Sequence, residues 1–295
     1  MRTNAIIRII IWSIVIVLLV SILGCGLLYR SHRINDRPPA ETAVPIPIEN
    51  TEPIQGTATE QSSFSTDNIQ ELKIEWAAGT ISIRPDPSIK TILVSESDVH
   101  NEKYRMMCKT RGDKLTISYT DEAVSGFGIS IGEDLRKDLT ILVPTDWVCR
   151  NLDIDAASAN LEVSDLTIQE VEFDGASGVC HFDNCTVDNL DVDTASGDIY
   201  FQGALEVLDF DAASASFYGV MTIVPRRLEM DGMSGNLELT LPENAGFTVE
   251  TEGLSTNFTS DFTTTTRNGA HIHGDGECQI RMEGMSGKVI IHKAQ

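Results

Sequence analysis

The sequence predicts an all-β protein, a β-solenoid in which coils of about 20 residues stack on one another, after one N-terminal transmembrane helix. Three observations predict this fold. Similar segments recur along the chain, apolar residues alternate within each segment, and one uncharged apolar stretch stands near the N-terminus. The chain has 295 residues, 41% of them hydrophobic, so it can bury a sizeable core and is not wholly disordered.

The chain opens with a flank, residues 1–8, and an apolar segment, residues 9–29. This segment, IIIWSIVIVLLVSILGCGLLY, carries no charge, and a helix rising 1.5 Å per residue spans a hydrocarbon core of about 30 Å with it. It is longer than the apolar region of a cleaved signal peptide, about 7–15 residues. An uncleaved single-pass anchor is therefore predicted. The alternative is a lipoprotein, because residues 22–25 (ILGC) resemble a lipobox with Cys25 as the lipidated residue.

The charges that flank the apolar segment leave its orientation open. Arg2 and Arg8 precede it, and Arg30, Arg33 and Arg37 follow it. Taken literally, the positive-inside rule favours a cytoplasmic C-terminal domain, but the margin is one residue and long domains translocate largely regardless of charge. The 6 cysteines do not decide the compartment, because they show neither CxxC nor zinc-site spacing.

Residues 30–65 are predicted to be a linker, because they are rich in Pro, Thr and Glu and have no apolar periodicity. Residues 66–295 then form the solenoid domain. Within it, the segments LDIDAASANLEV, VEFDGASGVCHF, LDVDTASGDIYF, LDFDAASASFYG and LEMDGMSGNLEL begin at 152, 171, 190, 208 and 228. Looser copies begin at 249 and 280, and LKIEWAAGTISI from 72 has Ala78 in the serine position.

A small-residue turn is expected at one position of each copy. The serines of this turn are Ser158, Ser177, Ser196, Ser214, Ser234, Ser255 and Ser286. In four copies a glycine follows, namely Gly178, Gly197, Gly235 and Gly287. The serines are 18 to 21 residues apart up to Ser255, and the last step of 31 residues predicts an inserted loop.

Apolar residues on either side of the turn alternate, which predicts two short strands in each copy. A strand cannot bury its apolar face alone, so the coils are expected to stack with like positions in contact. The expected inward columns are Ile154, Phe173, Val192, Phe210 and Met230, and Leu161, Cys180, Ile199, Phe217 and Leu237. Residues 87–148 lack the motif and are expected to form irregular coils at the first end. A β-sandwich is the alternative architecture.

A carboxylate stands three residues before each serine position. These residues are Glu75, Asp155, Asp174, Asp193, Asp211, Asp231, Glu252 and Glu283, and a second acidic row contains Asp153, Glu172, Asp191, Asp209, Glu229 and Glu250. Carboxylates about 4.8 Å apart repel by roughly 0.9 kcal/mol even in water. Turn N–H groups could offset this as in Asx-turns, or Ca²⁺ could bridge Asp155, Asp174, Asp193, Asp211 and Asp231. The calcium-loop spacing is absent, so a structural role is favoured and no metal or cofactor is predicted.

The remaining candidate sites are weaker. Arg111-Gly112-Asp113 spells an integrin-binding tripeptide but reads as a hairpin turn. His271 and His273 share one face of a strand without an evident third metal ligand. Cys180 and Cys185 fit buried apolar positions, and a disulfide between them stays open. A net charge of −22 excludes nucleic acid as a partner.

The repeated frame φ-x-φ-D-x-x-S-G-x-φ-x-φ, as in LDVDTASGDIYF, resembles the bacterial putative-adhesin domain of unknown function found in Gram-positive envelope proteins. The resemblance covers residues 70–293, with Gly replaced by Ala159, Ala215 and Thr256 in three copies. It implies a β-solenoid, extracytoplasmic placement and no established activity. It supplies no catalytic residues.

These observations predict a membrane-anchored, non-enzymatic binding or sensing ectodomain of the cell envelope. Its expected partners are the membrane, through residues 9–29, and a cell-wall polymer or an envelope protein. One alternative is a cytoplasm-facing regulatory partner of a membrane envelope-stress sensor. The other is a polysaccharide-acting β-helix enzyme, which is disfavoured because no copy breaks the frame with an acid, a base and a cation together.

Overall fold

The computed structural model describes residues 60–97, 104–120 and 136–294. All of them belong to the second of two compact units, Gly56–Gln295. In these ranges no helix is long and apolar enough to cross a bilayer. The predicted membrane segment, residues 9–29, and the possible lipid-bearing Cys25 lie outside the described residues.

The described residues form one 16-stranded sheet that winds through successive coils. The strands at its first end are β1 (Glu60–Ser65), β2 (Glu71–Pro85), β3 (Thr91–Ser97), β4 (Met107–Arg111), β5 (Lys114–Ser118) and β6 (Asp138–Val143). The middle strands are β7 (Cys149–Ser164), β8 (Thr167–Gly175), β9 (Cys180–Ser196), β10 (Ile199–Ser214) and β11 (Phe217–Met221). The far end holds β12 (Arg227–Leu241), β13 (Phe247–Ser260), β14 (Thr265–Arg267), β15 (Ala270–His273) and β16 (Cys278–Lys293).

The neighbouring coils pair in parallel, with equal positions of the repeat side by side. Ile154 pairs with Phe173, which pairs with Val192, and the column continues through Phe210 and Met230. The second predicted column, from Leu161 through Cys180, Ile199 and Phe217 to Leu237, is also in register. All ten side chains are buried. The predicted stacking of like side chains is thereby confirmed, and the described residues form a solenoid rather than a sandwich.

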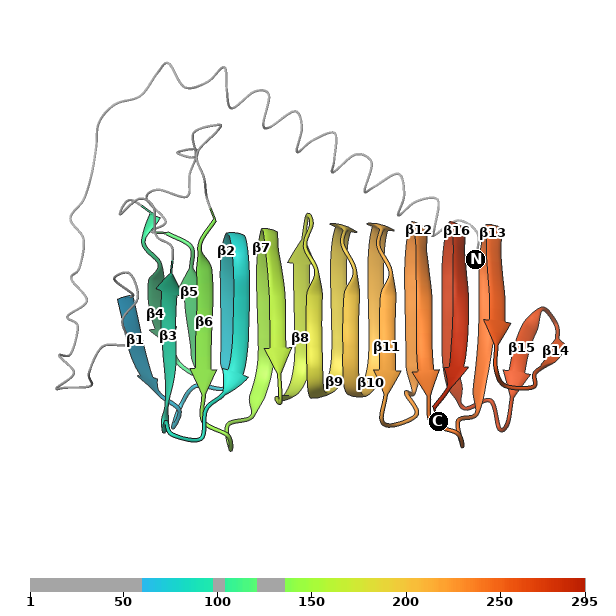
Figure 1. The fold of residues 1–295 in the computed structure, drawn as a ribbon, viewed down its shortest axis with the longest axis horizontal. Coiled ribbons are helices and arrows are strands. Elements are labelled where there is room, and N and C mark those ends of the chain that lie inside the picture. The colour runs from blue at the N-terminus through green and yellow to red at the C-terminus, as the bar shows by residue number, and fades with distance from the viewer. Residues whose placement is uncertain (1–59, 98–103, 121–135, 295) are drawn as a thin grey trace, which may run out of the picture. The chain divides into compact units, whose positions relative to one another are not determined.

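The order of the coils in space differs from their order in the sequence at both ends. At the far end β16 lies between β12 and β13 and pairs in parallel with both (Figure 1). In the hairpin of β14 and β15, β15 pairs antiparallel with the start of β13, at Phe247–Val249. The expected inserted loop therefore contains the β14–β15 hairpin of this end. After it, the chain returns and places β16 between β12 and β13. At the first end β2 lies between β7 on one side and β5 and β6 on the other.

Two expectations about segment boundaries were wrong. Residues 60–65, expected to end the linker, form β1, which pairs antiparallel with β3. The two short strands expected in each copy are joined in β2, β7, β12, β13 and β16, where one strand runs through the serine position. We call the turn at the serine position the corner of the coil. In these strands the pairing with the next coil continues through the corner.

The corner differs among the copies, but the difference does not simply follow the missing glycines. Gly178 and Gly197 have φ values of +145° and +119°, whereas Gly235 and Gly287, like Ala159 and Ala215, are not in the positive-φ region. A Cβ on Gly197 would lie 1.9 Å from the carbonyl oxygen of Gly178 in the coil below. Glycine is required at position 197 both for its backbone angle and for the close approach of the neighbouring coil.

We expect Gly197→Ala to lower the free energy of unfolding by about 2–3 kcal/mol, because alanine is strained at positive φ and its Cβ meets a carbonyl. Urea unfolding measures this as a lower midpoint with an unchanged slope. The matched control is Ala215→Gly at the same repeat position, which should cost about 1–2 kcal/mol through chain entropy and the loss of one buried methyl group. Equal losses in the two variants would contradict the proposed corner geometry.

The cysteines of the described residues are free thiols, so the open Cys180–Cys185 disulfide is not formed. Cys180 and Cys185 are buried, as expected for small apolar residues in an inward column. Burial raises the pKa of Cys180 to about 12 and that of Cys185 to about 11. These thiols are therefore protonated and unreactive at neutral pH.

Candidate functional site

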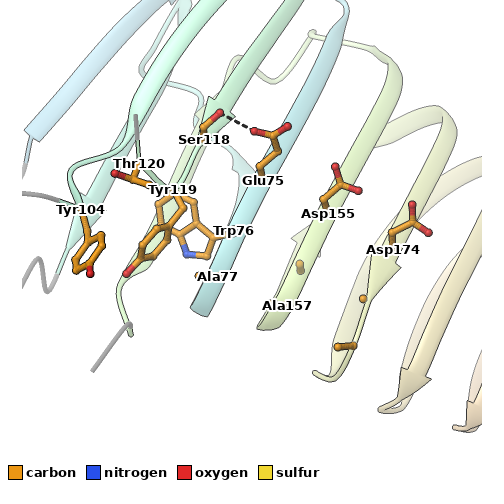
Figure 2. Close-up of a pocket in the computed structure, with 13 residues that line it drawn as sticks. Glu75, Trp76, Ala77, Tyr104, Ser118, Tyr119, Thr120, Asp155, Ala157 and Asp174 are labelled. Atoms are coloured by element: carbon orange, nitrogen blue, oxygen red, sulfur yellow. Dashed lines mark hydrogen bonds between the residues drawn. The ribbon is translucent and has the colours of Figure 1, made fainter. Parts of the chain in front are cut away.

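A pocket of about 510 Å³ lies at the serine-bearing corner of β2, β7 and β8. Its floor is made of small residues that precede the serine position, namely Ala77, Ala156, Ala157, Gly175 and Ala176. The carboxylates of Glu75, Asp155 and Asp174 stand in a row on three neighbouring strands, with aromatic rings to one side (Figure 2). The pocket thus combines a small-residue floor, an acidic rim and an aromatic wall.

The aromatic wall is formed by Trp76, Tyr104 and Tyr119. The rings of Trp76 and Tyr119 pack edge to face with centroids 5.3 Å apart, and those of Tyr104 and Tyr119 are 6.1 Å apart. Trp76 pairs with Ala156 of the next coil, so it occupies a position that is small elsewhere in the stack. This exchange of a small residue for tryptophan was the sequence signal that could have located the pocket.

Beside the aromatic wall lies a buried ion pair between Lys137 and Glu96. The Lys137 ammonium contacts Glu96 Oε2 at 2.5 Å and donates to the carbonyl oxygens of Tyr104 and Tyr119 at 2.5 and 2.7 Å. It also lies 4.6 Å from the ring centroid of Trp76 and 4.2 Å from that of Tyr119. Burial lowers the pKa of Lys137, and the Glu96 carboxylate opposes this shift. Lys137 therefore holds the aromatic wall in place, because it binds the carbonyl oxygens of both tyrosines and contacts the rings of Trp76 and Tyr119.

The carboxylates that line the pocket continue along the stack as the predicted acidic column. Glu75, Asp155, Asp174 and Asp193 are aligned by the strand register, and the column runs on to the far end through Asp211, Asp231, Glu283 and Glu252. The second row runs beside it, from Lys73 and Asp153 through Glu172, Asp191, Asp209 and Glu229 to Arg281 and Glu250. We call these two rows the acidic wall.

Cations compensate the acidic wall at its two ends. Lys73 Nζ lies 3.0 Å from Asp153 and 2.8 Å from Asp155. Burial opposes the charge of Lys73, but its hydrogen bonds to Asp155 and Asp153 raise its pKa above the usual value. At the far end Arg281 lies 3.3 Å from Glu283 and 3.6 Å from Glu252.

Burial and like charges disfavour the ionised form of the carboxylates in the middle of the wall. Burial, together with the neighbouring carboxylates, raises the pKa of Glu172, Asp174, Asp191 and Asp193. These four residues belong to β8 and β9, next to the pocket. A carboxylate with a raised pKa gains more than an ordinary one from a nearby cation. The middle of the wall is therefore the part that favours a cationic ligand most.

We expect the domain to become more stable as the pH falls from 7 towards 5. Acids with raised pKa bind protons more tightly in the folded state, so the free energy of unfolding rises as they protonate, above the ordinary carboxyl pKa of about 4. Below that pH the free energy of unfolding should fall again. Asp86, Asp113 and Glu243 have lowered pKa values, so their stabilising contribution is lost as they become protonated. Thermal melts between pH 4 and 8 measure both limbs.

The matched variant for this prediction is Asp193→Asn. It removes repulsion of roughly 0.9 kcal/mol from each adjacent carboxylate, so it should stabilise the domain at pH 7 by about 1 kcal/mol and flatten its pH dependence. Added salt should stabilise the parent chain more than the variant, since salt screens the repulsion. A stability that falls steadily from pH 7 to 5 would contradict the charge assignment.

The serine column is contiguous, but its hydroxyls do not cap the carboxylates. Ser177 Oγ donates to Ser158 Oγ at 3.3 Å, and Ser196 Oγ donates to the Ala176 carbonyl at 3.4 Å. Within the described residues, which include both turns, Asp174 and Asp193 accept no hydrogen bond from the turn that follows each of them. Asx-type capping therefore does not offset the charge at these two positions.

The turns are held instead by polar side chains two residues after the serine position. Asn160 Oδ1 accepts a hydrogen bond from the backbone N–H of Val179 at 3.0 Å, and Asp198 Oδ1 accepts one from Ser216 N–H at 3.0 Å. Ser216 Oγ in turn accepts from Asn236 N–H at 3.1 Å. Each side chain thus caps the backbone of the next coil. The recurrent Asn, Asp and Ser at this position were the overlooked signal.

The remaining predicted site residues do not assemble a site. Among the described residues no three His, Cys, Asp or Glu side chains gather closely enough to hold a metal ion, and the wall spaces its carboxylates along a line. His271 Nδ1 faces Thr266 Oγ1 at 3.2 Å, and His273 Nδ1 faces the Thr263 carbonyl at 2.8 Å. The turn between β4 and β5 contains Gly112 and Asp113, as the hairpin reading expected.

Several solved structures are similar to this chain. A putative adhesin from Bacteroides fragilis is 12% identical, with a TM-score of 0.47 over 80% of this chain and 98% of that one. A putative cell adhesion protein from Clostridium sporogenes is 10% identical, with a TM-score of 0.37 over 80% and 99%. A putative lipid binding protein from Parabacteroides distasonis is 16% identical, with a TM-score of 0.38 over 81% and 96%.

No curated protein is similar in sequence to this chain. Residues 69–216, half of the 295 residues, match the sequence profile of a domain family of unknown function. The match begins just before β2 and ends just after β10, so it includes every strand that lines the pocket. This match agrees with the expectation of an adhesin-like family of unknown function. The chain belongs to the Toastrack DUF4097 family.

Proposed function

We propose that the protein is a non-enzymatic binding or sensing domain of the cell envelope, and that its ligand is an elongated cationic molecule. The pocket at the corner of β2, β7 and β8 carries this proposal, because it joins an aromatic wall to the carboxylates of Glu75 and Asp174, which form no ion pair with any described residue, whereas Asp155 is paired with Lys73. An amine or ammonium group beside Asp174 would offset the burial and the repulsion from neighbouring carboxylates that together raise the pKa of that residue.

The periodicity of the wall sets the form of the ligand. Carboxylates recur at each coil, about 4.8 Å apart along the stack. A chain with several amino groups can lie along Asp174 and Asp193 while its end enters the pocket. A cationic cell-wall polymer or a basic segment of an envelope protein has this chemistry.

The test uses the pentalysine peptide as the probe and fluorescence anisotropy as the readout. Filling the pocket floor by Ala157→Met and Ala176→Met should weaken binding at least fivefold. The fold accepts methionine at this repeat position, because Met233 and Met285 occupy it in other coils. The control is Ala195→Met, at the same position outside the pocket, which should leave the affinity unchanged. Equal affinities of the parent chain, the double variant and the control for the peptide would contradict the proposal, because binding would then depend only on net charge.

We further propose that residues 9–29 tether this domain to the membrane with the domain outside the cell. The length of that uncharged stretch supports the tether, and the adhesin-like family supports the placement. Protease treatment of intact cells should digest the domain. Full protection of the domain would favour a cytoplasmic regulatory partner of a membrane sensor instead.

A further inference from the structure

Three large apolar side chains stand exposed side by side at the far end of the stack. They are Met233 on β12, Met285 on β16 and Leu254 on β13, exposed by 56%, 52% and 86%. The pairings Ser234–Ser286 and Ser255–Ser286 place the residues just before these serines on adjacent strands. We call Met233, Met285 and Leu254 the apolar ridge. Because β16 lies between β12 and β13 (Figure 1), Met285 is the middle member of the ridge.

The ridge is a local departure from the repeat. The position before the serine holds alanine in the other five coils, at Ala77, Ala157, Ala176, Ala195 and Ala213. Packing within a coil therefore does not require a large side chain here. Three side chains exposed by half or more, on adjacent strands about 4.8 Å apart, form a continuous apolar strip, which typically marks an interaction site.

We propose that the apolar ridge docks a segment of another polypeptide that carries both apolar and cationic side chains. The acidic side of the ridge sets the charge of this partner, because Glu283 and Glu252 stand two residues before Met285 and Leu254. Arg281 neutralises only part of this charge. A net charge of −22 opposes a second copy of this chain and an anionic lipid surface. The two flexible methionines suit a partner whose apolar side chains vary.

The test compares two labelled peptides of equal length and charge, one with lysines and leucines and one with lysines and serines. Both are attracted by the acidic wall, so only the difference between them reports on the ridge. The full chain should bind the leucine peptide at least tenfold more tightly. The variant Met233→Ala, Leu254→Ala and Met285→Ala should lose this preference and keep its affinity for the serine peptide. Its melting temperature should stay within a few degrees, because alanine is the residue of the other coils.

A control variant removes exposed apolar side chains elsewhere, by Val148→Ala and Ile223→Ala, which are 51% and 39% exposed in the parent. It should keep the tenfold preference. If the triple variant also keeps it, or if the parent shows no preference, the proposal is wrong. Ridge-dependent binding to phosphatidylcholine vesicles without a peptide preference would assign the ridge to a lipid surface and overturn the proposal. Loss of pentalysine binding on filling the pocket is independent of all these outcomes.

Discussion

Lys137→Ala is expected to lower the free energy of unfolding by about 3–5 kcal/mol, because it leaves the Glu96 carboxylate buried without its cation. The side chains of both residues are almost completely inaccessible, at 2% and 0% exposure. The variant also leaves the carbonyl oxygens of Tyr104 and Tyr119 without their charged donor. Urea unfolding followed by circular dichroism measures the loss.

A matched variant is Lys73→Ala, which removes another lysine that holds two partners, both on the neighbouring strand β7. Its ion pairs with Asp153 and Asp155 are partly exposed, so the cost should be about 1 kcal/mol or less. The Lys137 variant should also weaken pentalysine binding, since the aromatic wall depends on Lys137. Equal losses of stability in the two lysine variants would show that the pair with Glu96 does not hold the first end together.

Ending the chain after Glu277, which removes β16, is expected to unfold the far end of the solenoid. β16 is the shared neighbour of β12 and β13. It supplies five buried side chains, Cys278, Ile280, Met282, Val289 and Ile291. Large buried apolar side chains contribute about 1.5–3 kcal/mol each. The loss is comparable with the whole net stability of a typical domain, about 5–15 kcal/mol.

Hydrogen exchange resolves the effect along the stack. Amides of β12 and β13 should lose protection in the shortened chain, whereas those of β7 and β8 should keep it, because each coil of a solenoid contacts only its neighbours. Removing Ala294 and Gln295 alone is the control and should change the melting temperature by no more than a few degrees. Retained protection in β13 without β16 would contradict the observed strand order.

The sequence was sufficient to predict the columns of the core. Leu161 and Cys180 share a column because their copies share one register, and a slip of one residue would turn every apolar side chain outward. The sequence could not predict that β16 precedes β13 along the stack. Both copies carry the same frame, so Met282 and Thr251 are alternative neighbours for Met230, and only the three-dimensional path of residues 261–277 decides between them.

The candidate site was predicted only in part, for a related reason. The acidic rim of the pocket follows from the repeat, so Glu75, Asp155 and Asp174 were singled out. Tyr104, Tyr119 and Lys137 belong to the irregular first end, where no periodicity links their positions. Their contacts join segments far apart in the chain, and the local sequence around Lys137 indicates only a charged residue before β6. Long-range packing of this kind leaves no pattern in a single sequence.

Cross-linking of engineered cysteines tests the strand order most directly. Adjacent coils are about 4.8 Å apart, within the Cα–Cα range of a disulfide, whereas coils two steps apart are roughly twice as far and exceed it. A chain with Ser234→Cys and Ser286→Cys should therefore form an intramolecular disulfide under mild oxidation. A chain with Ser234→Cys and Ser255→Cys should not. The reverse result would place the coils in sequence order, and the described strand order of the far end would be wrong.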